Sequence, residues 1–108
     1  MHEYIGIVYN VVDGDTIDVL IDLGFKIFTK QRLRLNGLDT PERGQPGFNE
    51  AKTWLESQIL NQQVNIKTSK VSKFGYYLAD VTKGSISINE GLLDQKLAKP
   101  YDGGSKLK

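Results

Sequence analysis

Hydrophobic and polar side chains alternate along the first part of the chain with the two-residue period of β-strands. Three stretches show it, at residues 4–9, 16–22 and 26–35. Asp13-Gly14 separates the first two stretches and Leu23-Gly24 the second and third, and Asp-Gly between β-branched residues is a strong hairpin signal. The pattern therefore predicts a meander of three antiparallel strands.

The period changes to that of an α-helix after Asn49. The apolar side chains then share one helical face, namely Ala51, Trp54, Leu55 and Ile59. Two more alternating stretches follow at residues 64–68 and 76–81, and a lysine-bearing loop separates them. The chain is therefore expected to contain one long helix and five strands.

The last predicted element is a short helix that opens with a capping box. Ser87 and Glu90 have the S-x-x-E spacing in which the two residues satisfy each other's backbone N–H groups. The apolar positions of this helix are Ile88, Leu92, Leu93 and Leu97. Pro100 is expected to stop it. Because the early connections are too short for parallel crossovers, we predict an α+β, mainly β fold, with a five-stranded barrel and one long and one short packed helix.

With 108 residues, 39% hydrophobic and 25% charged, the chain has the composition of one soluble globular domain. We expect this domain to cover residues 1–101 and the weakly apolar residues 102–108 to form a flexible tail. No apolar run could span a bilayer, and the first residues lack the order of a signal peptide. We therefore expect an intracellular protein that does not bind membranes. We also expect a monomer, although no sequence feature bears on the oligomeric state.

The absence of cysteine excludes disulfides and thiolate metal sites, and the single histidine, His2, lies at a terminus. Any metal must therefore be held by oxygen. A net charge of +1 argues against a protein that binds nucleic acid by neutralising many phosphates. Residues 1–66 carry six Lys or Arg against nine Asp or Glu, and residues 67–108 carry eight Lys against four acids. Random scatter explains this asymmetry as well as an acidic pocket with basic surroundings does.

Acidic residues occur at two places where local structure explains them to different degrees. The hairpin turn accounts for Asp13 but leaves Asp15 as an acid at the start of a strand, where it is disfavoured. Asp39 and Glu42 belong to Asp39-Thr40-Pro41-Glu42, which taken alone is best explained as a turn or as a helix start capped by Asp39 or Thr40.

Arg34, taken alone, would be a solvated strand residue. Together with the three acids it indicates a site for chemistry on phosphate. Hard cations such as Ca²⁺ bind carboxylates, carbonyls and water, and a partly filled site leaves room for a phosphate oxygen. Phosphodiester hydrolysis needs charge neutralisation, a positioned water and stabilisation of the departing oxygen. Two aspartates, a glutamate and an arginine meet these needs, so a divalent-metal phosphodiester site is predicted.

Five short segments match a known family in their order and spacing. They are Asp13-Gly14-Asp15-Thr16, Arg34-Leu35, Asp39-Thr40-Pro41-Glu42, Lys73-Phe74-Gly75, and Ile88-Asn89-Glu90 with Leu97-Ala98-Lys99. They resemble the staphylococcal nuclease (thermonuclease) family from about Tyr4 to about Tyr101. The resemblance implies that family's five-stranded OB-fold barrel, although the chain stops where the family usually continues into its last C-terminal helix.

The resemblance also implies a role for each candidate. Asp15 and Asp39 correspond to the carboxylate ligands of Ca²⁺, and the backbone carbonyl of Thr40 to a third ligand. Glu42 corresponds to the glutamate that orients or deprotonates the attacking water, and Arg34 to the arginine that hydrogen-bonds the scissile phosphate. The implied activity is Ca²⁺-dependent hydrolysis of DNA or RNA, single-stranded or locally melted, with low sequence specificity. It would leave 3′-phosphate and 5′-hydroxyl ends.

Tyr76 stands where the family has its second active-site arginine. A tyrosine contributes one neutral donor and no positive charge. Since losing one transition-state donor typically costs about 10²- to 10³-fold in turnover, weakened activity is expected. Lys70, Lys73, Arg32 or Arg43 could instead reach the phosphate from another direction.

Phe74 and Tyr101 match family aromatics near the bound nucleotide, where stacking together with Lys70 and Lys73 gives sequence-tolerant binding. Plain packing of the aromatics and solvation of the lysines are the alternatives. The alternative function is a non-catalytic nucleic-acid or nucleotide binding module that keeps the metal site and has lost cleavage through Tyr76. A third hypothesis is an interaction domain without an active site. The presence of all three acids and the arginine argues against it.

Overall fold

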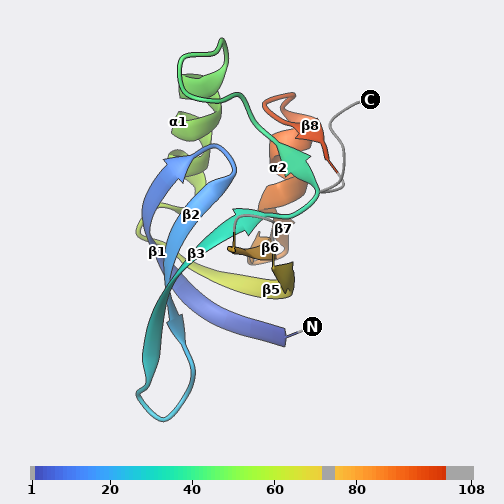
Figure 1. Ribbon diagram of the computed structural model, residues 1–108. Coiled ribbons are helices and arrows are strands. Elements are labelled where there is room, and N and C mark those ends of the chain that lie inside the picture. Colours follow the sequence, from blue (N-terminus) through green and yellow to red (C-terminus); the bar gives the residue numbers. More distant parts are fainter. Residues whose placement is uncertain (1, 72–74, 102–108) are drawn as a thin grey trace.

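The computed structural model describes residues 2–71 and 75–101, without the side chains of His2 and Lys70. The main elements (Figure 1) are β1 His2–Asp13, β2 Thr16–Asp22, β3 Phe28–Leu35, α1 Phe48–Ile59, β5 Gln63–Val71, β6 Tyr77–Lys83 and α2 Ile88–Asp94. Three two-residue strands complete the described part, namely β4 Leu38–Asp39, β7 Ile86–Ser87 and β8 Lys99–Pro100.

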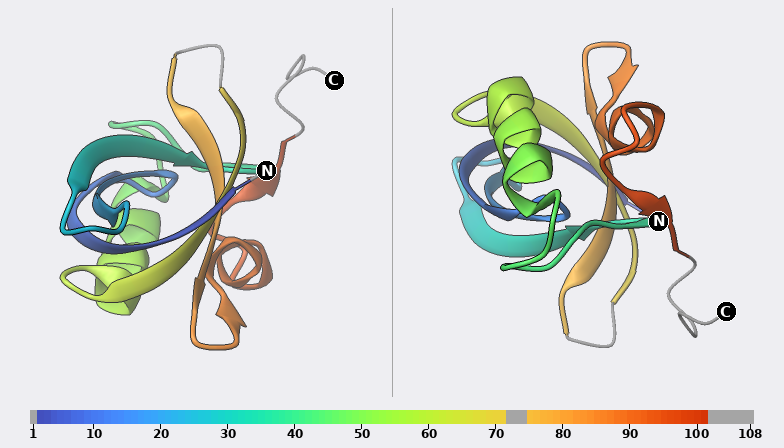
Figure 2. Two further views of the ribbon diagram at one scale, coloured as in Figure 1. Left: turned by 90° about the horizontal axis from the view of Figure 1, so that it is seen from below. Right: turned by 90° about the horizontal axis from the view of Figure 1, so that it is seen from above.

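The five longer strands close into a barrel. β2 pairs with β1 and β3, β1 also pairs with β5, and β5 pairs with β6, all antiparallel. A parallel contact between β6 and β3 closes the ring. Figure 2 shows the strands curving around one interior, with α1 against β1 and α2 against β6. The predicted mainly β fold, a five-stranded barrel with one long and one short helix, is confirmed.

Alternating side chains fill the barrel and the predicted helix faces cover it. Buried positions include Val8, Val19, Ile21, Leu33, Leu35, Ile66 and Val81 on the strands, and Leu55, Ile59, Ile88 and Leu92 on the helices. The predicted Ser87 cap is present, since its side chain accepts a hydrogen bond from Glu90 N. The two helices meet at Trp54 of α1 and Gly91 of α2. A Cβ on residue 91 would lie only 2.7 Å from the Trp54 ring, so this close contact needs glycine.

Several elements end elsewhere than predicted, and left-handed backbone is the reason at two of the ends. β3 begins at Phe28, not at residue 26, because Phe25 and Lys26 have φ of 55° and 62° and form the turn. α2 ends at Asp94 instead of continuing through Leu97, since Lys96 has a φ of 60°. β1 is longer than residues 4–9 because it continues past a register shift between Val8 and Asn10.

The three short strands are not predicted, because two residues cannot display a period. β4 and β8 pair through Leu38 with Pro100 and Asp39 with Lys99. Pro100 therefore lies in a strand and does not itself terminate the helix. The backbone N–H of Tyr101 donates to the Gly37 carbonyl at 2.9 Å, so this pairing ties the C-terminal segment to the segment that carries Asp39.

No helix within residues 2–71 and 75–101 is long and apolar enough to cross a membrane. The predicted flexible tail at 102–108 lies outside the described residues, as do residues 72–74.

Candidate functional site

Asp15 is buried in the turn between β1 and β2, with 4% of its surface exposed. Gly14 makes this position possible, because a Cβ there would lie 2.7 Å from Ala51 Cβ and 2.9 Å from Thr40 Oγ1. The turn is therefore pressed against α1 and against the segment after β3. Within the turn, the Asp15 N–H donates to Asp13 Oδ1 at 3.1 Å.

The segment after β3 brings Asp39 and Thr40 to this turn. The backbone N–H of Thr40 donates to Asp15 Oδ2 at 3.1 Å, across 25 residues of sequence. No helix begins at Pro41, since α1 starts at Phe48, so the interpretation of Asp39 or Thr40 as a helix cap is wrong. A tertiary contact with Asp15 takes the place of that local role.

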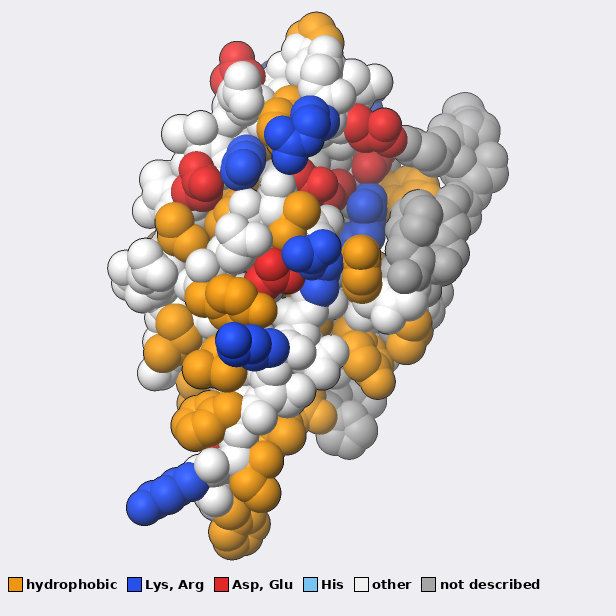
Figure 3. All heavy atoms as spheres, turned by 60° about the vertical axis from the view of Figure 1, so that its left-hand side comes forward, with side chains coloured by type: hydrophobic (Ala, Val, Ile, Leu, Met, Phe, Trp, Pro, Cys, Tyr) orange, Lys and Arg blue, Asp and Glu red, His pale blue; other side chains and the backbone are white. Residues whose placement is uncertain are grey.

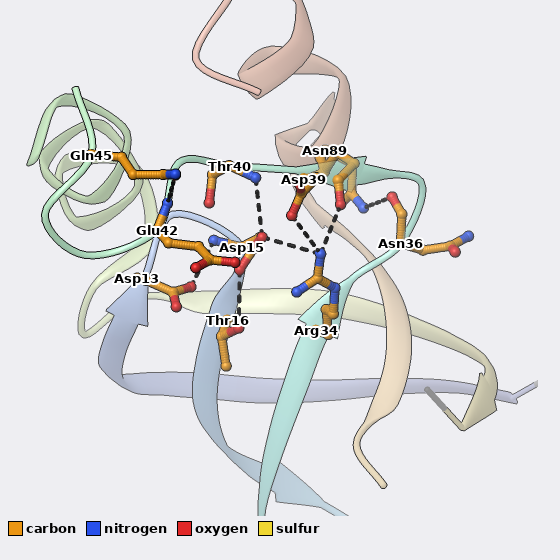
Figure 4. Close-up of polar contacts among 11 residues, drawn as sticks. Asp13, Asp15, Thr16, Arg34, Asn36, Asp39, Thr40, Glu42, Gln45 and Asn89 are labelled. Atoms are coloured by element: carbon orange, nitrogen blue, oxygen red, sulfur yellow. Dashed lines mark hydrogen bonds and ion pairs between the residues drawn. The ribbon is translucent and has the colours of Figure 1, made fainter. Parts of the chain in front are cut away.

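Arg34 lies between the two aspartates (Figure 4). Its Nη2 is 3.1 Å from Asp39 Oδ1, 3.3 Å from Asp15 Oδ2, and 3.3 Å from the carbonyl oxygen of Leu38. Only 16% of the Arg34 side chain is exposed. Arg34 is therefore not the solvated strand residue that it would be if taken alone. The guanidinium of this β3 residue thus links two carboxylates that come from two other segments of the chain.

Glu42 lies in the loop before α1 and is held there by Gln45. The Glu42 N–H donates to Gln45 Oε1 at 2.8 Å, and the Gln45 N–H donates to the Glu42 carbonyl at 2.9 Å. Figure 4 shows the Glu42 side chain directed toward Asp15. Glu42 is exposed, so its carboxylate faces the cluster from the solvent side.

Burial, followed by the hydrogen bond and the charge of Asp13, raises the pKa of Asp15 to about 6 against the smaller opposing effects of Arg34 and the Thr40 N–H. A buried carboxylate whose ionised form is disfavoured gains strongly from a nearby cation. No three His, Cys, Asp or Glu side chains form a metal cluster within the described part of the chain. The carboxylates of Asp15 and Asp39, gathered around Arg34, offer a smaller set of hard oxygens, which fits a cation such as Ca²⁺ that completes its shell with water or substrate oxygens.

Asn89 in α2 supports the segment between Arg34 and Asp39 (Figure 4), and from the sequence it is known only as a member of a matched segment. Its Oδ1 accepts from the Val81 N–H at 2.9 Å, and its Nδ2 donates to the carbonyls of Asn36 at 3.0 Å and Ala79 at 3.1 Å. Asn89 is 5% exposed. A polar residue on the buried face of the short helix was the available signal, since such a residue needs partners.

Tyr76, at the position of the family's second arginine, lies near Arg32. Asp18 first and Tyr76 second raise the pKa of Arg32. Arg32 also holds Asp18 in a two-pronged ion pair, with Nε at 2.7 Å from Oδ1 and Nη2 at 3.1 Å from Oδ2, which lowers the pKa of Asp18. Tyr76 therefore borders a cation of β3 that lies two residues before Arg34.

The remaining candidates fall into three groups. Tyr101 lies beside the site, with the Arg34 Cζ 5.7 Å from the centre of its ring, and it lines a groove next to Asp39 and Lys99. Arg43 lies over the ring of Phe48 at 5.1 Å. Lys73, Phe74 and the side chain of Lys70 lie outside the described residues.

Fold and site together define a small closed β-barrel that gathers an arginine and two aspartates beside the β1–β2 turn. The profile of the family described as "Staphylococcal nuclease homologue" matches residues 32–106. The chain is also 35% identical to the thermonuclease of Staphylococcus hyicus over 100 residues, which covers 85% of this chain and 56% of that protein. The chain therefore belongs to the staphylococcal nuclease family.

Two other relatives agree with this assignment. The micrococcal nuclease of Shigella flexneri is 33% identical over 79 residues, covering 73% of this chain and 42% of that protein. The endonuclease Htp3 of Saprolegnia parasitica is 33% identical over 116 residues, covering 89% and 55%. The chain spans about half the length of the curated relatives it matches.

Proposed function

We propose that this chain hydrolyses phosphodiester bonds in DNA or RNA by a Ca²⁺-dependent reaction of low sequence specificity. Family membership supports nuclease chemistry. The observation that carries the proposal is the position of Arg34, whose Nη2 lies within 3.3 Å of both Asp15 and Asp39. A phosphate-binding fork and two hard-cation ligands thereby meet at one point.

Asp15, Asp39 and the Thr40 carbonyl would hold the ion. When bound, a divalent ion supplies charge neutralisation for the phosphate oxygens and lowers the pKa of coordinated water. Arg34 stands between the same two carboxylates. We expect its guanidinium to leave them for the scissile phosphate when substrate and ion bind, since a guanidinium recognises carboxylate and phosphate with the same fork.

Glu42 is the proposed acceptor for the proton of the attacking water, as a general base or as the group that positions that water. The water oxygen forms a bond to phosphorus, and the bond from phosphorus to the 5′ oxygen breaks. The departing oxygen takes a proton from solvent. The products would carry 3′-phosphate and 5′-hydroxyl ends.

Single-stranded or locally melted nucleic acid is the proposed substrate form. Tyr101 stands over Arg34, where an unpaired base next to the scissile phosphate could stack on its ring. Lys70, Lys73 and Phe74 are proposed to contribute to the same binding, on family resemblance alone. A monomer is the proposed active form.

A second candidate is a binding module that keeps the metal site without useful cleavage. The neutral side chain of Tyr76 favours it, because Tyr76 occupies the position of the second arginine and interacts with Arg32. Tyr76 would then be the reason for low turnover.

Degradation of single-stranded and supercoiled DNA with Ca²⁺, Mg²⁺ or a chelator tests the proposal. We expect cleavage with Ca²⁺ that is abolished by chelator and strongly reduced in Glu42→Gln. The matched control is Glu56→Gln on α1, which removes an acid outside the site. Cleavage indifferent to chelator and to Glu42→Gln would contradict the proposal, and a Ca²⁺-dependent thermal shift without cleavage would select the binding module.

A further inference from the structure

The outward face of β3 carries a row of side chains that leads away from the site. Residues 28, 30 and 32 are exposed and Arg34 is partly so, whereas Leu33 and Leu35 point into the barrel. The row, which we call the β3 track, consists of Phe28, Lys30, Arg32 and Arg34. Alternate residues of a strand lie about 6.7 Å apart, so the track places a cation at each of three successive steps.

Neighbouring strands add an aromatic ring and an anchor to the track. Lys30 Nζ lies 5.5 Å from the centre of the Tyr9 ring, which places Tyr9 of β1 on the same face. Tyr9 is the residue at the register shift between β1 and β2, and such a bulge re-aims a side chain. Asp18 of β2 holds Arg32 by two nitrogens while 42% of the Arg32 side chain remains exposed.

Exposed aromatic rings accompany these cations. Tyr9 is 43% exposed and Phe28 is 54% exposed. Figure 3 shows Lys and Arg side chains following one another down this face from the acidic cluster to an apolar tip. Cations that follow a backbone, combined with rings on which bases stack, are the features of sequence-tolerant single-strand binding.

We propose that the β3 track binds the substrate strand beyond the scissile phosphate, with Lys30 and Arg32 on successive phosphates and Tyr9 and Phe28 under unpaired bases. The choice of ligand rests on the proposed function. Charge complementarity to a polyanion and continuity with Arg34 both support it. The track commits the protein to single-stranded nucleic acid several nucleotides long.

A lipid surface is the other ligand that an apolar tip could take. Phe25 at the β2–β3 turn is 98% exposed, and Leu23 and Ile27 beside it are about half exposed. A membrane-docking hairpin carries cations around its tip, and the exposed Lys26 lies there. Lys30 and Arg32 continue from the tip along β3 toward Arg34, and this continuous row of cations favours nucleic acid.

The test compares the wild-type chain with Lys30→Gln and with Lys30→Gln/Tyr9→Ala. Binding to an oligothymidylate of roughly twelve nucleotides, within the span of one OB fold, is measured by anisotropy in chelator over a range of salt concentrations. We expect Lys30→Gln to reduce the slope of log affinity against log salt by about 0.7, the value for one lost phosphate contact on a single strand. The double variant should bind about fivefold or more weakly, since a lost stacking contact alone costs that much.

The matched control is Lys67→Gln, which removes a half-exposed strand lysine from β5, a strand that does not pair with β3. Cleavage of a thymidine dinucleotide with Ca²⁺ reports the proposed function separately, because so short a substrate cannot extend along the track. If the chain cleaves the dinucleotide but both variants bind the oligonucleotide as tightly as the wild-type chain does, the proposal for the β3 track is wrong and the proposed catalysis stands. Absent cleavage with variant-sensitive binding would overturn the proposed catalysis and support the track.

Binding of the wild-type chain to vesicles of anionic phospholipid is measured alongside. Sedimentation with vesicles that requires Phe25, together with no binding to the oligonucleotide, would overturn the track in favour of a membrane-docking hairpin.

Discussion

Asn89 in α2 donates from its side-chain amide to the carbonyl oxygen of Asn36, 3.0 Å away and 53 residues earlier in the chain. Asn36 lies in the connection between β3, which carries Arg34, and β4, which carries Asp39. The same amide group binds Val81 and Ala79 of β6. Asn89 therefore fixes the connection between Arg34 and Asp39 to the barrel wall.

Replacing Asn89 with Ala should destabilise the protein by about 2–4 kcal/mol, because buried backbone groups of β6 and of the β3–β4 connection lose their partner. Urea unfolding measures the change. Asn65→Ala, at an exposed position of β5, is the matched control and should stay within about 0.5 kcal/mol. Equal effects of the two substitutions would show that the Asn89 hydrogen bonds contribute nothing specific.

The raised pKa of Asp15 predicts how stability depends on pH in the absence of metal. Burial raises the pKa of Asp15 to about 6, whereas an unfolded aspartate titrates near about 3.9. The native state therefore binds more protons between these values, so the unfolding free energy should fall as pH rises from about 4 to about 6. The loss should be on the order of 3 kcal/mol and nearly complete by about pH 7.

Asp15→Asn should flatten this pH dependence, and Asp80→Asn on β6 should leave it in place. Urea unfolding in chelator at several pH values measures both. Added Ca²⁺ should raise the melting temperature more at pH about 7.5 than at about 5, since protons compete for the Asp15 carboxylate. If Ca²⁺ raises the melting temperature equally at both pH values, Asp15 is not a ligand of the ion.

Arg34→Lys keeps one positive charge but loses the planar fork that reaches Asp15, Asp39 and, by proposal, the phosphate. We expect the single-turnover cleavage rate to fall by about 10²- to 10³-fold. Arg43→Lys, at an arginine that packs over Phe48 instead, is the control and should cleave at nearly the wild-type rate. If both variants cleave alike, the fork of Arg34 is not required.

Tyr76→Arg should raise the cleavage rate about tenfold or more by restoring a charged donor, and leave Ca²⁺ affinity nearly unchanged. The gain has a structural limit, because the new side chain must accommodate Arg32, the present partner of Tyr76. Tyr77→Arg is the matched control, since Tyr77, the first residue of β6, is 45% exposed and directly follows Tyr76. A single-turnover rate that stays the same or falls in Tyr76→Arg would refute this explanation of weak activity.

The sequence predicted the elements that depend on local patterns. β2 coincides with the alternating residues 16–22, and the apolar face at Ala51, Leu55 and Ile59 is buried as the helical period requires. Where single-residue backbone conformation decided the outcome, the pattern was insufficient. Lys96 adopts a left-handed φ of 60°, and no apolar period encodes such a turn.

By itself, the sequence determined the strand and helix periods, the Ser87 cap, and the set of residue types that resembles the nuclease family. Only the tertiary structure brought the carboxylates of Asp15 and Asp39 within 3.3 Å of one Arg34 nitrogen, buried Asp15 enough to raise its pKa, and placed Tyr76 near Arg32. The physical reason is that periodicity records which face of an element is apolar, whereas contacts between distant turns depend on barrel closure and on close approaches such as that of Gly14 to Thr40.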